Sequence, residues 1–311
     1  MSDAAHGSER GALTKRAALA SMAMALILVI LKAWASWTTG SVAMLGSLAD
    51  NVLDLIASCI TFLGVRWAAM PADADHRFGH GKAEALAALV QVILITFSAL
   101  GIAWRAVARF SSGQPTQGLE LGVGVSIFAI AATFALLAYQ RYVIRRTGSV
   151  AISTDNLHYK TDIALNLSVI AALALDQLFG WRLADPIFGL GIALWLLWGA
   201  WRAASHSVDQ LMDREWPEAE RDAFLAATRD YPELAGLHDF RTRHSGAHRF
   251  VQFHVWVPPH WTVREAHDRL DHVEEQLQAR FPATEILIHV DPEGQVDRET
   301  MLPSELTEQA P

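Results

Sequence analysis

Six apolar stretches of membrane-spanning length constrain this chain more than any other feature of its sequence. A helix that crosses a bilayer needs about 20 consecutive, mostly apolar residues. Of the 311 residues, 52% are hydrophobic, and the mean hydropathy of +0.21 is high for a soluble protein. The sequence therefore predicts a membrane domain of six helices, over residues 17–37, 42–67, 83–110, 119–143, 152–179 and 186–207.

Charge divides the chain into two parts. Residues 1–211 carry 15 Lys and Arg against 13 Asp and Glu, whereas residues 212–311 carry 10 against 20. The second part is predicted to be an acidic soluble domain, for which nucleic acid is not an expected partner. The predicted domains are a cytoplasmic segment, a transmembrane metal-transport domain, a cytoplasmic metal-binding and dimerisation domain and a disordered tail, over 1–16, 17–211, 212–292 and 293–311.

Basic residues beside the predicted spans indicate the orientation. Lys15 and Arg16 precede the first span as in a signal anchor, and without a small-residue cleavage site this span is expected to be retained. The positive-inside rule puts both termini of this multi-pass chain in the cytoplasm, although Arg105 and Arg109 argue mildly against it. Cys59 is the single cysteine, so an intrachain disulfide and a thiolate metal site are excluded.

The pattern after residue 213 is that of a small α/β unit. A helix over 217–231 precedes two strands, and a second helix, capped by Thr262, precedes a third strand. This helix–strand–strand–helix–strand order predicts a small sheet with both helices on one face. The strands are expected over 237–243, 249–257 and 285–290, and the second helix ends near 280.

Two pairs of polar residues interrupt the apolar runs at the same spacing. Asp50 and Asp54 lie four residues apart, as do His158 and Asp162, and this spacing puts each pair on one face of a helix. Charged residues within a membrane are costly and by default indicate a functional site. Three carboxylates and one imidazole are suited to a four-coordinate divalent metal. The plainer alternative is that these groups only join helices by hydrogen bonds.

Several short motifs, in the same order along the chain, resemble those of the cation diffusion facilitators, above all the bacterial zinc and iron exporter branch. The resemblance covers about residues 15–292 and implies a homodimer in the bacterial inner membrane, with six-helix membrane domains and cytoplasmic ferredoxin-like (αββαβ) domains. It further implies export of divalent metal in exchange for protons. The motifs are Gly40-Ser41-Val42-Ala43, Asp50 and Asp54, Phe78-Gly79-His80-Gly81-Lys82, His158 and Asp162, and Leu237-His238-Asp239 with Arg241-Thr242-Arg243.

The same resemblance assigns residues to three metal sites. Asp75 is an alternative ligand of the loop site, and Val290 stands where relatives carry a side-chain amide. His244, His248 and His272 are interpreted as surface residues. The plainer alternative for the histidines that the resemblance assigns as ligands is that they too are solvated surface residues. The ligands assigned to the transport site are Asp50, Asp54, His158 and Asp162, and those assigned to the loop site are Asp73, His76 and His80. The ligands assigned to the cytoplasmic binuclear site are His238, His254, His267, His289 and Asp291. Separately, Lys82 and Asp213 match a charge pair that links the two membrane domains.

The ligand types restrict the ion and the function. Oxygen and imidazole ligands favour Zn²⁺ and accept Cd²⁺, Fe²⁺ or Co²⁺, whereas Cu(I) and Mg²⁺ are disfavoured. Like charges this close cannot all ionise without a cation, so protons are expected to replace a departing metal. The alternatives are a proton-coupled porter of organic substrates and a membrane metal sensor that does not transport. An enzyme is not expected, because no H-E-x-x-H motif occurs. Lys32 has no role in this scheme and is expected to snorkel or to face a cavity.

Overall fold

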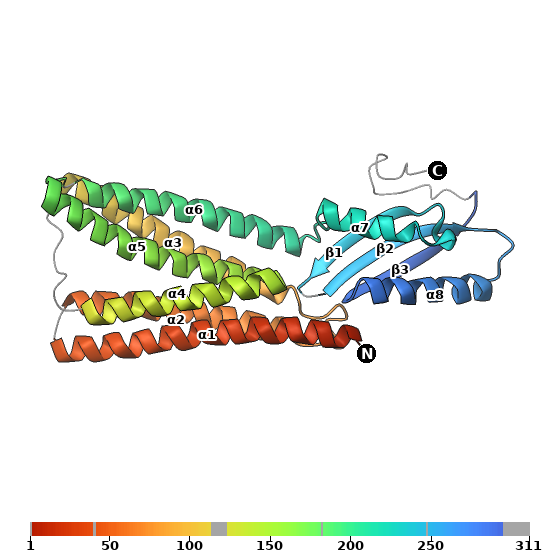
Figure 1. The fold of residues 1–311 in the computed structure, drawn as a ribbon, viewed down its shortest axis with the longest axis horizontal. Helices are drawn as coiled ribbons and strands as arrows, with labels where there is room; N and C mark the ends of the chain where they lie inside the picture. The colour runs from red at the N-terminus through yellow and green to blue at the C-terminus, as the bar shows by residue number, and fades with distance from the viewer. Residues whose placement is uncertain (1, 40–41, 113–122, 182, 247, 295–311) are drawn as a thin grey trace. The chain divides into compact units, whose positions relative to one another are not determined.

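Six long helices form the first part of the chain (Figure 1). The structure, a computed structural model, describes residues 2–39, 42–112, 123–181, 183–246 and 248–294, and some side chains within helices, Asp50 among them, lie outside that description. The predicted tail and the first residues of the predicted fourth span therefore lie mainly outside the described residues. The helices are α1 (Ser2–Thr39), α2 (Val42–Ala68), α3 (Ala83–Ser112), α4 (Val123–Thr147), α5 (Val150–Phe179) and α6 (Ala184–Leu211).

The helices differ in how apolar they are. Among the described residues, four stretches are long and apolar enough to cross a membrane, in α1, α2, α3 and α6. In α5, Asp155, Lys160 and Asp162 fall in the first half of the helix and lower its hydropathy. Polar residues of membrane helices usually face the interior of the bundle or a water-filled cavity. Asp155 is fully buried, whereas Lys160 is exposed.

Small residues allow the six helices to pack closely. One cluster joins Ala17 and Ala18 of α1 to Val65 of α2, Val143 of α4 and Ile152 of α5. A second cluster joins α3 to α6, through Val92, Ile95, Ala99, Leu196 and Ala200. Alanine at such contacts lets backbones approach where lipid supplies no hydrophobic drive for association.

The second part of the chain is an αββαβ unit. Strand β2 (His248–Val257) lies between β1 (His238–Ser245), to which it pairs antiparallel, and β3 (Thr284–Pro292), to which it pairs parallel. The parallel pairing is possible because α8 (Val263–Arg280) forms the crossover between β2 and β3. The first helix is α7 (Glu218–Thr228), and a short 3₁₀ turn, η1 (Pro232–Leu234), follows it.

Both helices of this unit cover one face of the sheet, as the sequence predicted. Alternate residues of β2, namely Val251, Phe253, Val255 and Val257, are buried in one core with residues of α7 and α8. Thr262 caps α8, as predicted: its hydroxyl accepts from the Glu265 backbone N–H, and the Glu265 carboxylate accepts from the Thr262 N–H. The opposite face of β2 carries the exposed Gln252 and the partly exposed His254.

The chain forms two compact units that are not divided at a single point in the sequence. Residues 10–71 and 82–208 form one unit, here called the membrane unit, and residues 1–9, 72–81 and 209–311 form the other, the soluble unit. The connection between α2 and α3 thus groups with the soluble unit. Backbone contact accounts for this grouping, since a Cβ on Gly81 would collide with the backbone of Ser245 and Gly246 at the β1–β2 turn.

Candidate metal centres

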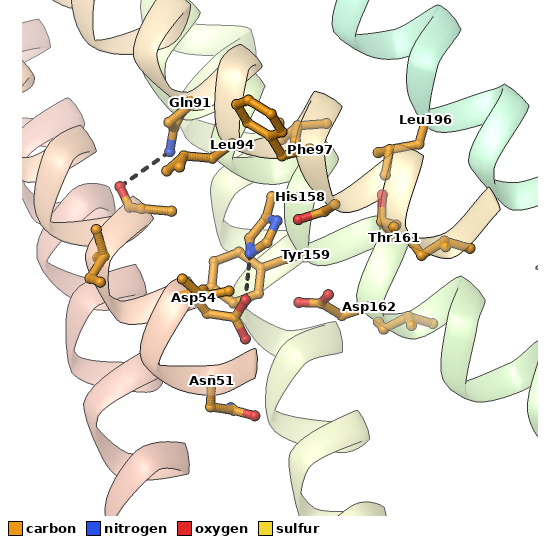
Figure 2. Close-up of a pocket in the computed structure, with 18 of the residues that line it drawn as sticks. Asn51, Asp54, Gln91, Leu94, Phe97, His158, Tyr159, Thr161, Asp162 and Leu196 are labelled. Carbon is orange, nitrogen blue, oxygen red and sulfur yellow. Dashed lines mark hydrogen bonds and ion pairs between the residues drawn. The ribbon is translucent and has the colours of Figure 1, made fainter. Parts of the chain in front are cut away.

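Asp54, His158 and Asp162 converge inside the membrane unit (Figure 2). Asp54 Oδ1 lies 2.8 Å from His158 Nε2, and one ligand atom from each of the three residues lies within 4.8 Å of the others. The side chains of Asp54 and His158 are only 16% and 17% exposed. In a tetrahedral metal site with bonds of about 2.0–2.1 Å, ligand atoms are separated by roughly 3.4 Å. The three groups therefore fit around one divalent ion with little rearrangement.

Asp50, the fourth predicted ligand, lies on the same helix. It precedes Asp54 by one turn of α2, and its side chain is outside the described residues. The helical backbone keeps positions four apart on one face. Asp50 thus remains a predicted ligand on the face that carries Asp54.

The three residues line a pocket of about 520 Å³ within the membrane unit. Leu28, Ile95 and Phe97 contribute apolar walls, while Thr133 and Thr161 contribute hydroxyl groups. Two cations, Lys32 and Arg105, also line this pocket. The Lys32 ammonium, from α1, donates a hydrogen bond to Oδ1 of Asn51, which lies on α2 together with Asp54. The sequence had left Lys32 open between snorkelling and facing a cavity, and the structure supports the cavity.

A buried polar network adjoins the pocket, and sequence reasoning gave it no role. Asp155 accepts hydrogen bonds from Gln140 Nε2 (2.7 Å) and Gln91 Nε2 (3.3 Å). Gln140 also donates to Ser21 Oγ (2.9 Å) and accepts from Asn156 (3.0 Å), so the network connects α1, α3, α4 and α5. The only signal in the sequence was the cluster of polar residues in the first half of α5.

The predicted loop ligands Asp73, His76 and His80 also come together. Asp73 Oδ1 lies 3.4 Å from His76 Nδ1, and Asp73 Oδ2 lies 3.3 Å from His80 Nε2. The backbone N–H of His76 donates to Asp73 (2.7 Å) and lowers the pKa of its carboxyl, and the N–H of Asp75 acts in the same direction. This ionised form is the one that binds metal. The side chain of Asp75, the alternative ligand, is exposed and outside this cluster.

Aromatic contacts fix the loop on the sheet of the soluble unit. The Phe78 ring packs edge-on against Phe250 of β2, with ring centres 5.9 Å apart. The Arg243 guanidinium from β1 lies over both rings. His80, two residues after Phe78, is thereby buried, with 4% of its side chain exposed.

Strand register brings the predicted cytoplasmic ligands together. His254 of β2 is the pairing partner of His238 in β1 and of His289 in β3, so three imidazoles lie side by side across the sheet. Asp291 reaches all three: Oδ2 lies 2.9 Å from His254 Nδ1 and 3.3 Å from His238 Nε2, and Oδ1 lies 3.3 Å from His289 Nε2. His238 Nδ1 lies 2.9 Å from the Gly236 carbonyl, to which it can only donate. Nε2 of neutral His238 is then free to bind metal.

A bulge puts His238 on this face. Simple alternation from Thr242 and Phe240, which face the core, would direct His238 into the core as well. The pairing shifts between His238 and Arg241, where Asp239 adopts a φ of +48°. This irregularity reverses the alternation and turns His238 toward His254.

The other predicted residues lie apart from these clusters. His267 is on the exposed side of α8 and is not among the grouped ligands of the described chain. His272 is exposed and bonds to Gln276, as expected of a surface residue, whereas His244 is partly buried against Trp216. Asp213 pairs with Arg243 at 3.5 Å within the soluble unit. Lys82 belongs to the membrane unit, so its pairing with Asp213 stays a prediction.

Comparison with known proteins gives matches over nearly the whole chain. The cation efflux transmembrane domain matches residues 18–212, and the cytoplasmic domain of cation efflux proteins matches residues 216–293. The cation-efflux pump FieF of Salmonella arizonae is 40% identical over 289 residues, which are 93% of this chain and 96% of the relative. FieF of Klebsiella pneumoniae is 40% identical over 92% of this chain and 95% of its own length.

Solved structures match the soluble part. The transporter CzrB in its Zn form is 33% identical, with a TM-score of 0.25 over 28% of this chain and 99% of that one. The metal-bound C-terminal domain of the CzcD transporter from Thermotoga maritima is 24% identical, with the same TM-score over 26% of this chain and all of that one. The family assignment rests on the sequence matches, because these cover nearly the whole chain.

Proposed function

Because this chain belongs to the cation diffusion facilitator family, and is a membrane cation-efflux transporter rather than an enzyme, we propose that it exports Zn²⁺ in exchange for protons. The single observation that carries this proposal is the convergence of Asp54, His158 and Asp162 in a pocket of the membrane unit. Cd²⁺, Fe²⁺ and Co²⁺ accept the same ligands and are the competing cargoes.

The chemistry of the pocket supports exchange. Asp54 and Asp162, with Asp50 as the predicted fourth ligand, concentrate negative charge that a divalent ion neutralises. When the ion leaves, protons on these carboxylates and on His158 neutralise the same charge. Exchange then requires that the pocket open to one side of the membrane at a time, by rocking of helices around a fixed site.

We assign the two other clusters to regulation by resident metal. In the soluble unit, Asp291 presents one oxygen to His238 and His254 and the other to His289, an arrangement suited to two ions. His267, exposed on α8, is then available to a partner's site in the proposed homodimer. Metal at this face would bring two soluble domains together and bias the membrane domains, which is allosteric coupling. The proposed location is the bacterial inner membrane, with both termini in the cytoplasm.

Uptake by everted, sealed vesicles with an imposed pH gradient tests the proposal. We expect gradient-dependent uptake of Zn²⁺, compared with Cd²⁺, Fe²⁺, Co²⁺ and Mn²⁺, that is lost in Asp54→Ala and in His158→Ala. Asp230→Ala, which removes an exposed carboxylate paired with Arg280, is the matched control and should transport normally.

Two outcomes would redirect the assignment. Full transport by Asp54→Ala would remove the pocket from the mechanism. Metal binding by the soluble unit without uptake of any ion would favour the non-transporting sensor.

A further inference from the structure

Lys32 brings a positive charge into the pocket that holds the transport ligands. It lines the same cavity as Asp54, His158 and Asp162, although it comes from α1 and they come from α2 and α5. We propose that Lys32 is the built-in counter-cation of the transport site, held back by Asn51 while metal is bound and neutralising the carboxylates after metal leaves. This inference rests on the transport function proposed above.

The position of the ammonium group supports this role. Lys32 donates to the side-chain oxygen of Asn51, which follows Asp50 directly and precedes Asp54 by three residues on α2. A neutral amide oxygen binds an ammonium group less strongly than a carboxylate does. The long, flexible lysine stem then lets the charge move between the amide and the nearby carboxylates.

The balance of charges explains why such a group is useful. The grouped ligands comprise two carboxylates and one imidazole, and predicted Asp50 adds a third carboxylate. Carboxylates held together in a membrane are unfavourable once their divalent ion has gone. A nearby ammonium stabilises this empty site and repels the bound ion, so both effects favour release.

Lys32 also stands on a particular side of the site. α1 ends at Thr39 and α2 begins at Val42, so Lys32 and Asn51 lie toward the connection between these helices, whereas Thr61 and Gln91 lie toward the opposite end. If both termini are cytoplasmic, the Lys32 side is the exit side. The charge is thus placed where it hinders return of the exported ion.

Zn²⁺ affinity of the full-length protein tests the proposal in a background without the other two sites. The background carries His76→Ala, His80→Ala, His254→Ala and Asp291→Ala, and competition with a fluorescent chelator at one fixed alkaline pH gives the Kd. We expect Lys32→Met to bind Zn²⁺ about tenfold more tightly, because a repulsive charge is removed, and to export it more slowly in vesicles. Lys32→Arg keeps the charge and should stay within about threefold of the background Kd.

A matched control separates a specific effect from a general one. Arg105 lines the same pocket but is more exposed than Lys32, and Arg105→Met should change the Kd by less than about threefold. Equal tightening by Arg105→Met would overturn a specific role for Lys32. If Lys32→Met does not fold, as judged by gel filtration, Lys32→Gln provides the same comparison.

The remaining outcomes are distinct. Unchanged or weaker binding by Lys32→Met, with export intact, would reject the counter-cation while leaving the transporter assignment standing. Tightening by Lys32→Arg equal to that of Lys32→Met would also reject it, because the effect would not follow charge. Retention of the full Zn²⁺ affinity by Asp54→Ala would instead reject the transport site itself, and the inference with it.

Discussion

The guanidinium of Arg243 lies 4.6 Å from the centre of the Phe78 ring, which joins β1 to the loop that carries Asp73, His76 and His80. The same guanidinium lies 4.3 Å from the Phe250 ring on β2. The loop is connected by the chain to α2 and α3, yet its ligands are held by the sheet. Metal bound by these ligands would therefore act on a segment whose ends continue into the membrane unit.

The Arg243–Phe78 contact predicts how the loop site depends on the sheet. Phe78→Leu removes the ring that Arg243 covers, and with it a cation–π interaction of about 0.5–2 kcal/mol. We expect the loop to be less well ordered and its Zn²⁺ affinity to fall about tenfold, measured in protein with the transport and cytoplasmic ligands removed. Arg269→Gln breaks the similar contact between Arg269 of α8 and Trp261, which precedes that helix, and should leave the loop affinity unchanged. An equal loss in both variants would indicate general destabilisation.

The bulge at Asp239 predicts a conformational requirement at the cytoplasmic site. A β-branched residue is strained at a φ of +48°, so Asp239→Val should regularise the strand and turn His238 away from His254. The Zn²⁺ affinity of this site should fall about tenfold, while Asp239→Gly, which accepts this φ, should stay within about threefold. Titration of protein without the transport and loop ligands measures both. If valine and glycine behaved alike, the bulge would not be the cause.

The buried network predicts a stability effect that is separate from metal binding. Gln140→Leu removes one hydrogen bond to the Asp155 carboxylate, which keeps its bond from Gln91, and removes the acceptor of the Asn156 amide, at a cost of about 1–3 kcal/mol. We expect the thermal midpoint of the detergent-solubilised protein to fall by several degrees. Gln276→Leu, which removes an exposed bond to His272, is the control and should not lower it. An unchanged midpoint in Gln140→Leu would mean that water replaces the lost amide.

The cap of α8 predicts a pH dependence of stability. Hydrogen bonds from Thr262 lower the pKa of Glu265 from its ordinary 4.5, so the folded state favours the carboxylate. The stabilisation is present above pH 4.5 and is lost as the pH falls through the lowered pKa. Hydrogen exchange of α8 in the full chain should therefore be faster in Glu265→Gln than in wild type at neutral pH. This difference should disappear in acid.

Glu274, on the same helix, provides a control of opposite sign. Burial raises its pKa, and Asp271 and Glu285 act in the same direction. Folding thus disfavours its ionised form. Glu274→Gln should slow the hydrogen exchange of α8 at neutral pH, and this difference from wild type should shrink as the pH falls. The same direction of change in both variants would contradict the assigned causes.

Sequence periodicity was sufficient for most of the fold. Apolar length predicted the helices α1–α6, and the alternation of Val251, Phe253 and Val255 predicted which face of β2 is buried. The spacing of His158 and Asp162 puts both on one face of α5, and Asp54 lies near them because α2 packs against α5. The buried face of β2 and the shared face of α5 follow from periodicities within one segment, whereas the approach of α2 to α5 is a contact between segments.

Other features depend on contacts between segments and were not accessible in this way. Alternation along β1 would have put His238 in the core, and only the backbone at Asp239 shows otherwise. The bond between Lys32 and Asn51 and the network at Asp155 join residues that are far apart in the chain. No pattern within one helix specifies such partners.

The network at Asp155 also limits where the membrane unit can bend. Amide and carboxylate groups there connect α1, α3, α4 and α5 on the side of the pocket opposite Lys32. While these bonds persist, the helices can separate only beyond them, so the network would act as a fulcrum and the ends near Lys32 would swing. Spin labels on α1 and α5 should then change their separation more at those ends than at the level of Ser21. Equal changes at both levels would mean that the fulcrum lies elsewhere.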